Sequence, residues 1–259
     1  MLSLLLGLAF AEPDFTGALR EMREKKVEIS REASLGEGQG TFDSNSREIG
    51  NKVNCMTWMQ GVIAEAYGDT PERTQAYLDS LRYYGDTISF GTRKHYIDRW
   101  LALEPAPLIP VLLESCQPNM IGSVQLDLTR FKQNHNYQGR LFAEDKSQFS
   151  LDFLTPDKMD SCLMTLPEGY YALFFVANEQ YLKHWGKHGS MGQVHAIIIE
   201  KNEKILVHHA SIDFNKVVTE EWIGFHKRIL SVAEGYTIFG FDPAWQPKTD
   251  MKLADQGIR

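Results

Sequence analysis

The chain has 259 residues, of which 43% are hydrophobic and 11% aromatic, so it can bury a sizeable core as one large domain or two small ones. Its formal net charge of -7 argues against nucleic acid or an anionic membrane surface as the main partner, because both are bound through an excess of Lys and Arg. Beyond the first residues no stretch is long and apolar enough to span a bilayer, so no integral membrane segment is expected.

The N-terminal run from Leu2 to Ala11 is apolar and ends in an Ala-x-Ala-like pattern, but it lacks a positively charged start. Such a run is either the remnant of a secretory signal or an amphipathic helix that packs on the core. We therefore treat residues 1–28 as a leader or accessory helix. From Phe15 to Ala33 the pattern predicts a charged helix, with apolar contacts at Leu19, Met22, Val27 and Ile29.

A second helix is predicted to begin at Cys55 and to stop at Gly68; the glycine-rich loop Leu35–Gly40 before it lacks the spacing of a phosphate-binding loop. The first turn of a helix presents unpaired N–H groups and the positive end of the helix dipole. A sulfur at that position can be held as a thiolate at a lower pH than in an ordinary cysteine. The alternative is an inert core cysteine, since cysteine is among the residue types most often buried.

The next helix is predicted from Thr70 and Pro71, which supply an N-cap and a first-turn proline, with Tyr77, Leu78, Leu81 and Tyr84 on its buried side. A short helix with Ile97, Trp100 and Leu101 follows. Further along, alternating runs predict strands at Ser123–Leu128, Gln148–Phe153 and Tyr170–Val176. Helices followed by strands, with no repeat or linker between them, predict one α+β domain over residues 1–259.

A hairpin is predicted from Gln193–Glu200 and Ile205–Ser211, two β-rich runs around a short polar turn. With a loop of odd length, such as 201–203, His195 lies directly opposite His209 on one face; with an even loop it lies diagonal to His208. Beyond the hairpin, Thr219-Glu220-Glu221 is expected to cap a helix that carries Trp222, Phe225, Ile229 and Val232, and Tyr236–Phe241 is expected to form the last strand.

The three cysteines, Cys55, Cys116 and Cys162, do not have zinc-ribbon spacing. In an oxidising compartment one natural solution pairs Cys116 with Cys162 and leaves Cys55 as a thiol. In a reducing compartment all three are thiols.

Cys55 at a helix start and a histidine on a strand form the arrangement of a cysteine hydrolase. His195 would take the thiol proton, His209 would orient the ring of His195, and the Cys55 backbone N–H is a candidate oxyanion donor. For His195 the alternative is a hydrogen-bonded core histidine.

Four blocks of sequence, taken together with their order along the chain, are informative: Asn54–Gln60, Arg82–Gly85, Arg93–Trp100 and His208–Ser211. With these blocks the chain resembles the N-acetylmuramoyl-L-alanine amidase-like family, an NlpC-type, papain-like group of bacterial cysteine amidases. The resemblance extends from about residue 29 to about residue 240. It implies a fold in which N-terminal helices carry the cysteine and pack on a mostly antiparallel sheet.

The resemblance implies Cys55 as nucleophile, His195 as base and His209 as third member of a triad, with Arg93, His95 and Tyr96 near the substrate. The implied reaction cleaves the amide between the lactyl group of N-acetylmuramic acid and L-alanine in peptidoglycan fragments, with anhydro-muropeptides as the expected substrates. No cofactor is expected. A monomer in the bacterial cell envelope, periplasmic or secreted, is the expected form.

The sequence departs from the family at Asn54, where the family has Asp, at Trp58-Met59-Gln60, where it has F-V-E, and at Ile197, where it usually has Gly. The segment Ala177–Gly192 before the proposed base is expected to form a wall or lid of the site.

Two alternatives remain open at this point. One is a metal hydrolase that uses His184 and His188 with the pair His208-His209, although the glutamate of an H-E-x-x-H motif is missing. The other is a peptidoglycan-binding domain that keeps the fold without the chemistry.

Overall fold

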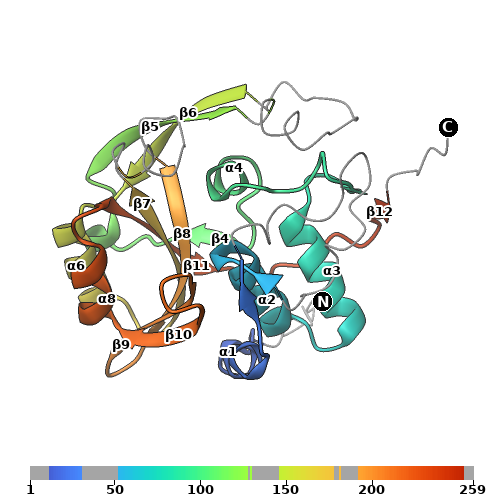
Figure 1. Cartoon of the computed structure of the whole chain (residues 1–259), viewed down its shortest axis with the longest axis horizontal. Helices are drawn as coiled ribbons and strands as arrows, with labels where there is room; N and C mark the ends of the chain where they lie inside the picture. The colour runs from blue at the N-terminus through green and yellow to red at the C-terminus, as the bar shows by residue number, and fades with distance from the viewer. Residues whose placement is uncertain are drawn as a thin grey trace, which may run out of the picture.

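A six-stranded antiparallel sheet, in the order β10-β9-β8-β7-β11-β4, forms the centre of the molecule (Figure 1). This computed structural model describes residues 12–30, 52–127, 129, 146–177, 181 and 192–253. The strands of the sheet are β4 (Leu108–Pro110), β7 (Gly169–Ala177), β8 (Gly192–Lys201), β9 (Ile205–Ser211), β10 (Lys216–Glu221) and β11 (Ala233–Phe241). The prediction of an α+β fold with a mostly antiparallel sheet is confirmed.

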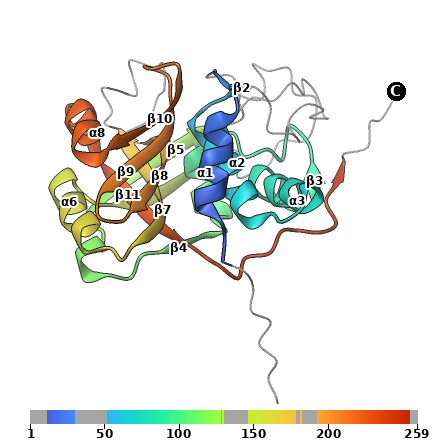
Figure 2. The same ribbon diagram turned by 90° about the horizontal axis from the view of Figure 1, so that it is seen from below.

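Helices cover both faces of the sheet (Figures 1 and 2). One face packs against the N-terminal helices α1 (Phe15–Glu24), α2 (Cys55–Tyr67), α3 (Pro71–Arg82) and α4 (Ile97–Leu103). The other packs against α6 (Pro156–Thr165) and α8 (Trp222–Ile229). Successive side chains of a strand point to opposite faces. Ala196 and Ile198 of β8 therefore join the first core, while Ile197 and Ile199 join the second.

Smaller elements surround the central sheet. A hairpin pairs β5 (Met120–Asp127) with β6 (Lys146–Phe153), and short parallel pairs join β1 (Glu28–Ile29) to β2 (Lys52–Val53) and β3 (Thr87–Ile88) to β12 (Lys252–Leu253). After β11 the chain crosses to α3 (Figure 2), where the Lys248 N–H donates to Ser80 Oγ over 2.8 Å. The segment that follows β11 thus ties α3 to the central sheet.

The first helix is shorter than the sequence predicts. It ends at Glu24, because Lys25 takes an extended backbone conformation and the next residues enter strand β1. Val27 and Ile29 still pack against the core, but from extended chain rather than from a helix. The pairing of β1 with β2 is a tertiary contact that overrides local helix propensity.

A strand stands where a helix cap was predicted. Thr219 and Glu220 belong to β10, which pairs with β9, and only Glu221 occupies the N-cap position of α8, without a side-chain cap bond. Val232 lies beyond the end of this helix. The short run before the helix is β-branched, with Val217, Val218 and Thr219, and this is the signal for a strand that the prediction missed.

A disulfide joins Cys116, in the short helix η2 (Glu114–Cys116), to Cys162 of α6. Cys55 takes no part in a disulfide. Of the two alternatives left open by the sequence, the pairing of Cys116 with Cys162 is therefore the correct one.

Several predicted features lie outside the described residues: the run up to Ala11, the loop Leu35–Gly40, both His184 and His188, and nearly all of the segment proposed as a wall or lid. Among the helices that are described, none is long and apolar enough to cross a membrane.

Candidate active site

Helix α2 begins at Cys55, where the sequence predicted its start. Asn54 is the N-cap: its side chain accepts a hydrogen bond from the Thr57 N–H at 2.9 Å, and the Thr57 hydroxyl accepts one from the Asn54 N–H at 2.9 Å. This reciprocal capping box fixes the first turn. Asn and Asp cap helices about equally well, so the departure from the family at Asn54 preserves the position of the cysteine.

The structure also shows what the side chains do at two other positions where the sequence departs from the family, Gln60 and Ile197. Gln60 is buried on α2, and its amide donates to the backbone oxygen of Leu81 at 3.3 Å, a bond that an ionised glutamate could not donate. Ile197, in place of the usual glycine, is fully buried in the core beneath α6 and α8. Both substitutions therefore serve packing around the site.

The Cys55 thiol is half-buried and points to the strand that carries His195. Its Sγ donates toward the carbonyl oxygen of Val194, the residue directly before His195, at 4.0 Å. The pairing of β7 with β8 runs from Phe175↔His195 to Val176↔Gln193, so Val194 is the extra residue of a β-bulge. A bulge leaves its extra residue outside the ladder and re-aims its neighbours. Here it coincides with the point at which α2 and β8 meet.

His195 and His209 meet side by side. Nε2 of His195 lies 2.8 Å from Nδ1 of His209, and the ring centroids are 4.9 Å apart with planes nearly perpendicular. The interaction between the two predicted histidines is therefore present.

The register that brings them together differs from the predicted one. The hairpin loop, residues 202–204, has an odd length as predicted, but the last recorded pair is Ile198↔His208. Extending this register by one residue sets His209 opposite Ile197, so His209 is diagonal to His195 and the prediction of direct opposition is wrong. Because side chains alternate with a period of two, a slip of two residues keeps both rings on one face. Diagonal neighbours remain within reach of ring side chains.

A carboxylate that the sequence reasoning did not assign to the site continues this chain of contacts. Oε1 of Glu220, on β10, lies 2.9 Å from Nε2 of His209. Arg228 of α8 holds the same carboxylate with two bonds, 2.7 Å to Oε2 and 2.6 Å to Oε1. Glu220 was predicted to cap a helix, and only the pairing of β10 with β9 reveals its place beside His209.

Burial and charge set the protonation of these groups. Burial lowers the pKa of His195 well below its usual value, and the neighbouring His209 and Arg228 lower it further. Burial also lowers the pKa of His209, although Glu220 opposes the effect. The hydrogen bonds from Arg228 lower the pKa of the Glu220 carboxyl. At neutral pH the site therefore holds two neutral imidazoles and one ionised carboxylate.

The adjacent His208 belongs to a separate group. Its Nε2 contacts Oε2 of Glu200 at 3.0 Å and its Nδ1 contacts the Thr219 hydroxyl at 2.9 Å. His208 comes directly before His209 on β9, so its side chain points to the opposite face of the sheet.

The predicted substrate-binding residues lie in a buried turn before α4. Arg93 is 3% exposed and donates to the Tyr83 hydroxyl at 3.4 Å, so its side chain is buried rather than solvated. His95 is 5% exposed and its Nε2 lies 2.9 Å from the carbonyl oxygen of Phe90. Tyr96 is the N-cap residue of α4. Their role toward a substrate stays a prediction.

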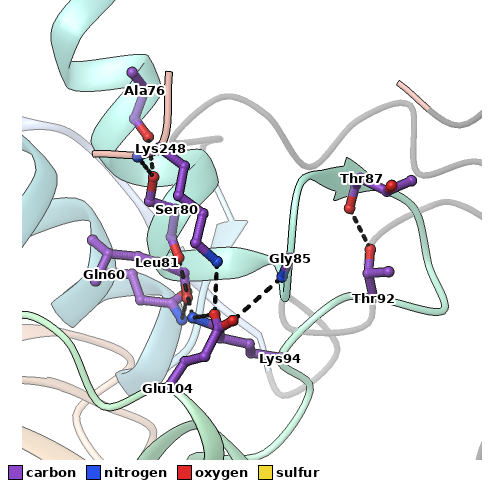
Figure 3. Close-up of polar contacts among 10 residues, drawn as sticks. All are labelled: Gln60, Ala76, Ser80, Leu81, Gly85, Thr87, Thr92, Lys94, Glu104 and Lys248. Atoms are coloured by element: carbon purple, nitrogen blue, oxygen red, sulfur yellow. Dashed lines mark hydrogen bonds and ion pairs between the residues drawn. The ribbon is translucent and has the colours of Figure 1, made fainter. Parts of the chain in front are cut away.

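Lys94 anchors this turn from within (Figure 3). Its ammonium group is buried, donates to the backbone oxygen of Ser80 at 3.1 Å and pairs with Glu104 at 3.2 Å. Glu104 also binds Lys248 of the C-terminal segment at 2.9 Å and the N–H of Gly85 at 3.3 Å. Burial lowers the pKa of Lys94 to about 8, against the opposing effect of Glu104. The network joins α3, the turn and the C-terminal segment into one support.

A second tether joins the turn to the strand of the proposed base. Asp98 of α4 is buried, and its carboxylate accepts a hydrogen bond from the Gln193 N–H at 2.9 Å. Asp98 is two residues after Tyr96, and Gln193 is two residues before His195. The helix that directly follows the Arg93–Tyr96 turn is thus hydrogen-bonded to the start of β8.

Within the described ranges, no group of three or more His, Cys, Asp or Glu side chains is arranged to hold a metal ion. Because His184 and His188 lie outside those ranges, the metal hydrolase alternative is left to experiment.

Comparison with solved structures shows that the fold occurs elsewhere. A protein from Legionella pneumophila str. Philadelphia 1 superposes with a TM-score of 0.68 at 16% identity, over 92% of this chain and 91% of that one. An N-acetylmuramoyl-L-alanine amidase from Bacteroides uniformis ATCC 8492 superposes with a TM-score of 0.56 at 14% identity, over 87% of this chain and 99% of that one. Among curated proteins, no sequence matches significantly.

Family comparison at the level of sequence is more direct. The profile of the AmiA-like family, described as N-acetylmuramoyl-L-alanine amidase-like, matches residues 32–229. This range includes Cys55, His195 and His209 and covers well over half of the chain. The chain therefore belongs to the N-acetylmuramoyl-L-alanine amidase-like family.

Proposed function

We propose that the protein is a cysteine amidase of the NlpC-type, papain-like kind, which hydrolyses the N-acetylmuramoyl-L-alanine amide bond of peptidoglycan fragments. The observation that carries the proposal is the contact of Cys55 Sγ with the carbonyl oxygen of Val194 at 4.0 Å, because the next residue of β8 is His195, whose ring is hydrogen-bonded to His209. Membership of the amidase-like family supports the class of bond.

In the proposed reaction the sulfur of Cys55 attacks the carbonyl carbon of the lactyl amide, while His195 takes the thiol proton. The backbone N–H groups at the start of α2 stabilise the oxyanion that forms. His195 then gives its proton to the amine of L-alanine, the C–N bond breaks, and a thioester remains on Cys55. A water molecule, deprotonated by His195, attacks the thioester, and the thiol is restored as the muramic acid carboxylate leaves.

Arg93, His95 and Tyr96 are proposed to line the substrate side of the site. A guanidinium group can bind a carboxylate with two parallel hydrogen bonds, which suits an anionic muropeptide on an acidic protein. The tether from Asp98 to Gln193 supports this placement, because it holds the turn next to the strand of the base.

The proposed setting is the bacterial cell envelope. The disulfide between Cys116 and Cys162 supports it, because structural disulfides persist mainly in oxidising compartments. Anhydro-muropeptides are the proposed substrates and a monomer is the proposed form.

Incubation with muramoyl-peptides, in the anhydro and the ordinary sugar form, tests the proposal by mass spectrometry of released peptide. Wild type is expected to release a peptide that begins with L-alanine, and Cys55→Ala is expected to lower the rate by at least about 10³-fold. Circular dichroism and thermal melting of Cys55→Ala show whether its fold is intact.

Two inhibitors separate the alternatives. Iodoacetamide is expected to abolish activity, whereas EDTA is expected to leave it unchanged; the reverse pattern would establish the metal hydrolase instead. Binding of the muramoyl-peptide by both proteins, without release of peptide by either, would identify a binding domain and refute the amidase.

A further inference from the structure

Glu220 closes a line of hydrogen bonds that starts at the proposed base. His195 contacts His209, His209 contacts Glu220, and Glu220 contacts Arg228, each at 2.9 Å or less. The line crosses three adjacent strands, β8, β9 and β10, and ends on α8. None of the four blocks that indicated the family contains Glu220 or Arg228.

The ionised carboxylate gives this line a direction. A carboxylate only accepts hydrogen bonds, so Nε2 of His209 must carry a hydrogen and donate it to Glu220. In a neutral imidazole the other nitrogen is then an acceptor, so Nδ1 of His209 accepts from Nε2 of His195. His195 therefore carries its hydrogen on Nε2, and its Nδ1 is the nitrogen with a lone pair that can take a proton.

Arg228 keeps the carboxylate in this state. Its two bonds occupy both oxygens of Glu220, and its guanidinium lies over the rings of Phe214 and Phe225, at 5.1 Å and 5.5 Å from their centroids. The rings restrict the arginine, and the two-pronged bond fixes the plane of the carboxylate. Phe225 also contacts His209, with ring centroids 5.3 Å apart.

We propose that Glu220, held by Arg228, is a positioning residue that sets the tautomers of His209 and His195 and so leaves Nδ1 of His195 unprotonated for the Cys55 thiol. The inference rests on the proposed function, because it assigns His195 the task of the base. Glu220 also compensates positive charge: when His195 becomes an imidazolium, its Nε2–H points along the line that ends at the carboxylate.

Among the residues that the structure describes, the charged and titratable groups that act on His209 are His195 on β8, Glu220 on β10, Arg228 on α8, and Asp213 in the turn between β9 and β10. Substituting Glu220 by Gln removes a negative charge and leaves Arg228 in place. The pKa of the imidazoles is then expected to fall, because the remaining neighbour is a cation.

The closing experiment compares Glu220→Gln with Glu200→Gln. Glu200 is a matched control, because it binds His208 in the same sheet but has no bond to His195 or His209. Glu220→Gln is expected to lower kcat about 10- to 100-fold with little change in KM, the scale found when a group that orients a metal-bound histidine is removed. Glu220→Asp, which keeps the charge, is expected to recover part of the loss, and Glu200→Gln to retain full activity.

A purely structural role for Glu220 would lower activity without altering its pH profile. The proposal instead requires that the limb of the kcat/KM profile that reports the imidazole moves to lower pH in Glu220→Gln and stays in place in Glu200→Gln. The rate of Cys55 alkylation by iodoacetamide as a function of pH gives the same readout without a substrate.

Nitrogen-15 NMR of wild type provides a test that needs no variant to fold. Both His195 and His209 are expected to carry their hydrogen on Nε2 at neutral pH; a hydrogen on Nδ1 of either would overturn the proposal. If the expected tautomers and alkylation shift are found but no muramoyl-peptide is cleaved, the proposed function fails and the role of Glu220 stands. If wild type cleaves the substrate and Glu220→Gln behaves like Glu200→Gln, the role of Glu220 is wrong and the amidase stands.

Discussion

Removal of the disulfide between Cys116 and Cys162 should weaken the fold by an amount that can be worked out from the chain it closes. The two cysteines are 46 residues apart, and closing a loop of this size in the unfolded chain corresponds to roughly 4 kcal/mol at 25 °C. At 2 to 4 °C per kcal/mol for a protein of this size, the double variant Cys116→Ser/Cys162→Ser should melt about 8 to 16 °C lower. Met159 and Leu163 of α6 are fully buried, so packing should keep α6 in place and preserve the fold.

The assay is thermal unfolding followed by circular dichroism, in a Cys55→Ala background so that the remaining thiol cannot exchange with the disulfide. Wild type treated with a reductant should approach the melting temperature of the double variant. Thiol titration of unreduced, denatured wild type should find one reactive thiol. Equal melting temperatures with and without the disulfide, or three reactive thiols, would refute the reasoning.

Two further predictions concern stability. In Gly235→Ala the new methyl group would overlap the backbone oxygen of Leu154, so we expect a loss of about 1–3 kcal/mol in denaturant unfolding, whereas Gly224→Ala, which meets open space on α8, should be neutral or stabilising. Equal effects of the two substitutions would contradict the packing seen at β11. Burial lowers the pKa of His208 and His209 from 6.5, so below about that pH the unfolded chain takes up protons that the folded chain does not. Stability should therefore fall with decreasing pH by up to about 1.4 kcal/mol per pH unit for each histidine, and a flat dependence between about pH 5 and 6.5 would contradict it.

The sequence alone determined those parts of the site that depend on neighbours a few residues apart. Asn54 and Thr57 specify the start of α2 through their reciprocal bonds, so the position of Cys55 could be predicted. Alternating β-rich runs around a short turn specified the hairpin of β8 and β9, and the period of two placed His195 and His209 on one face. Family resemblance then joined the cysteine to the histidines.

Only the tertiary structure decided the features that depend on contacts between distant segments. The register of β8 on β9 differs by two residues from the predicted one, and both registers satisfy the same alternation, so the pattern cannot distinguish them. The end of α1 depends on the pairing of β1 with β2, and the place of Glu220 depends on the pairing of β10 with β9 and on Arg228 of α8. Local propensity extends over a few residues, whereas these contacts form only when the chain is folded, because their free energy comes from burial and from bonds to side chains far away in the sequence.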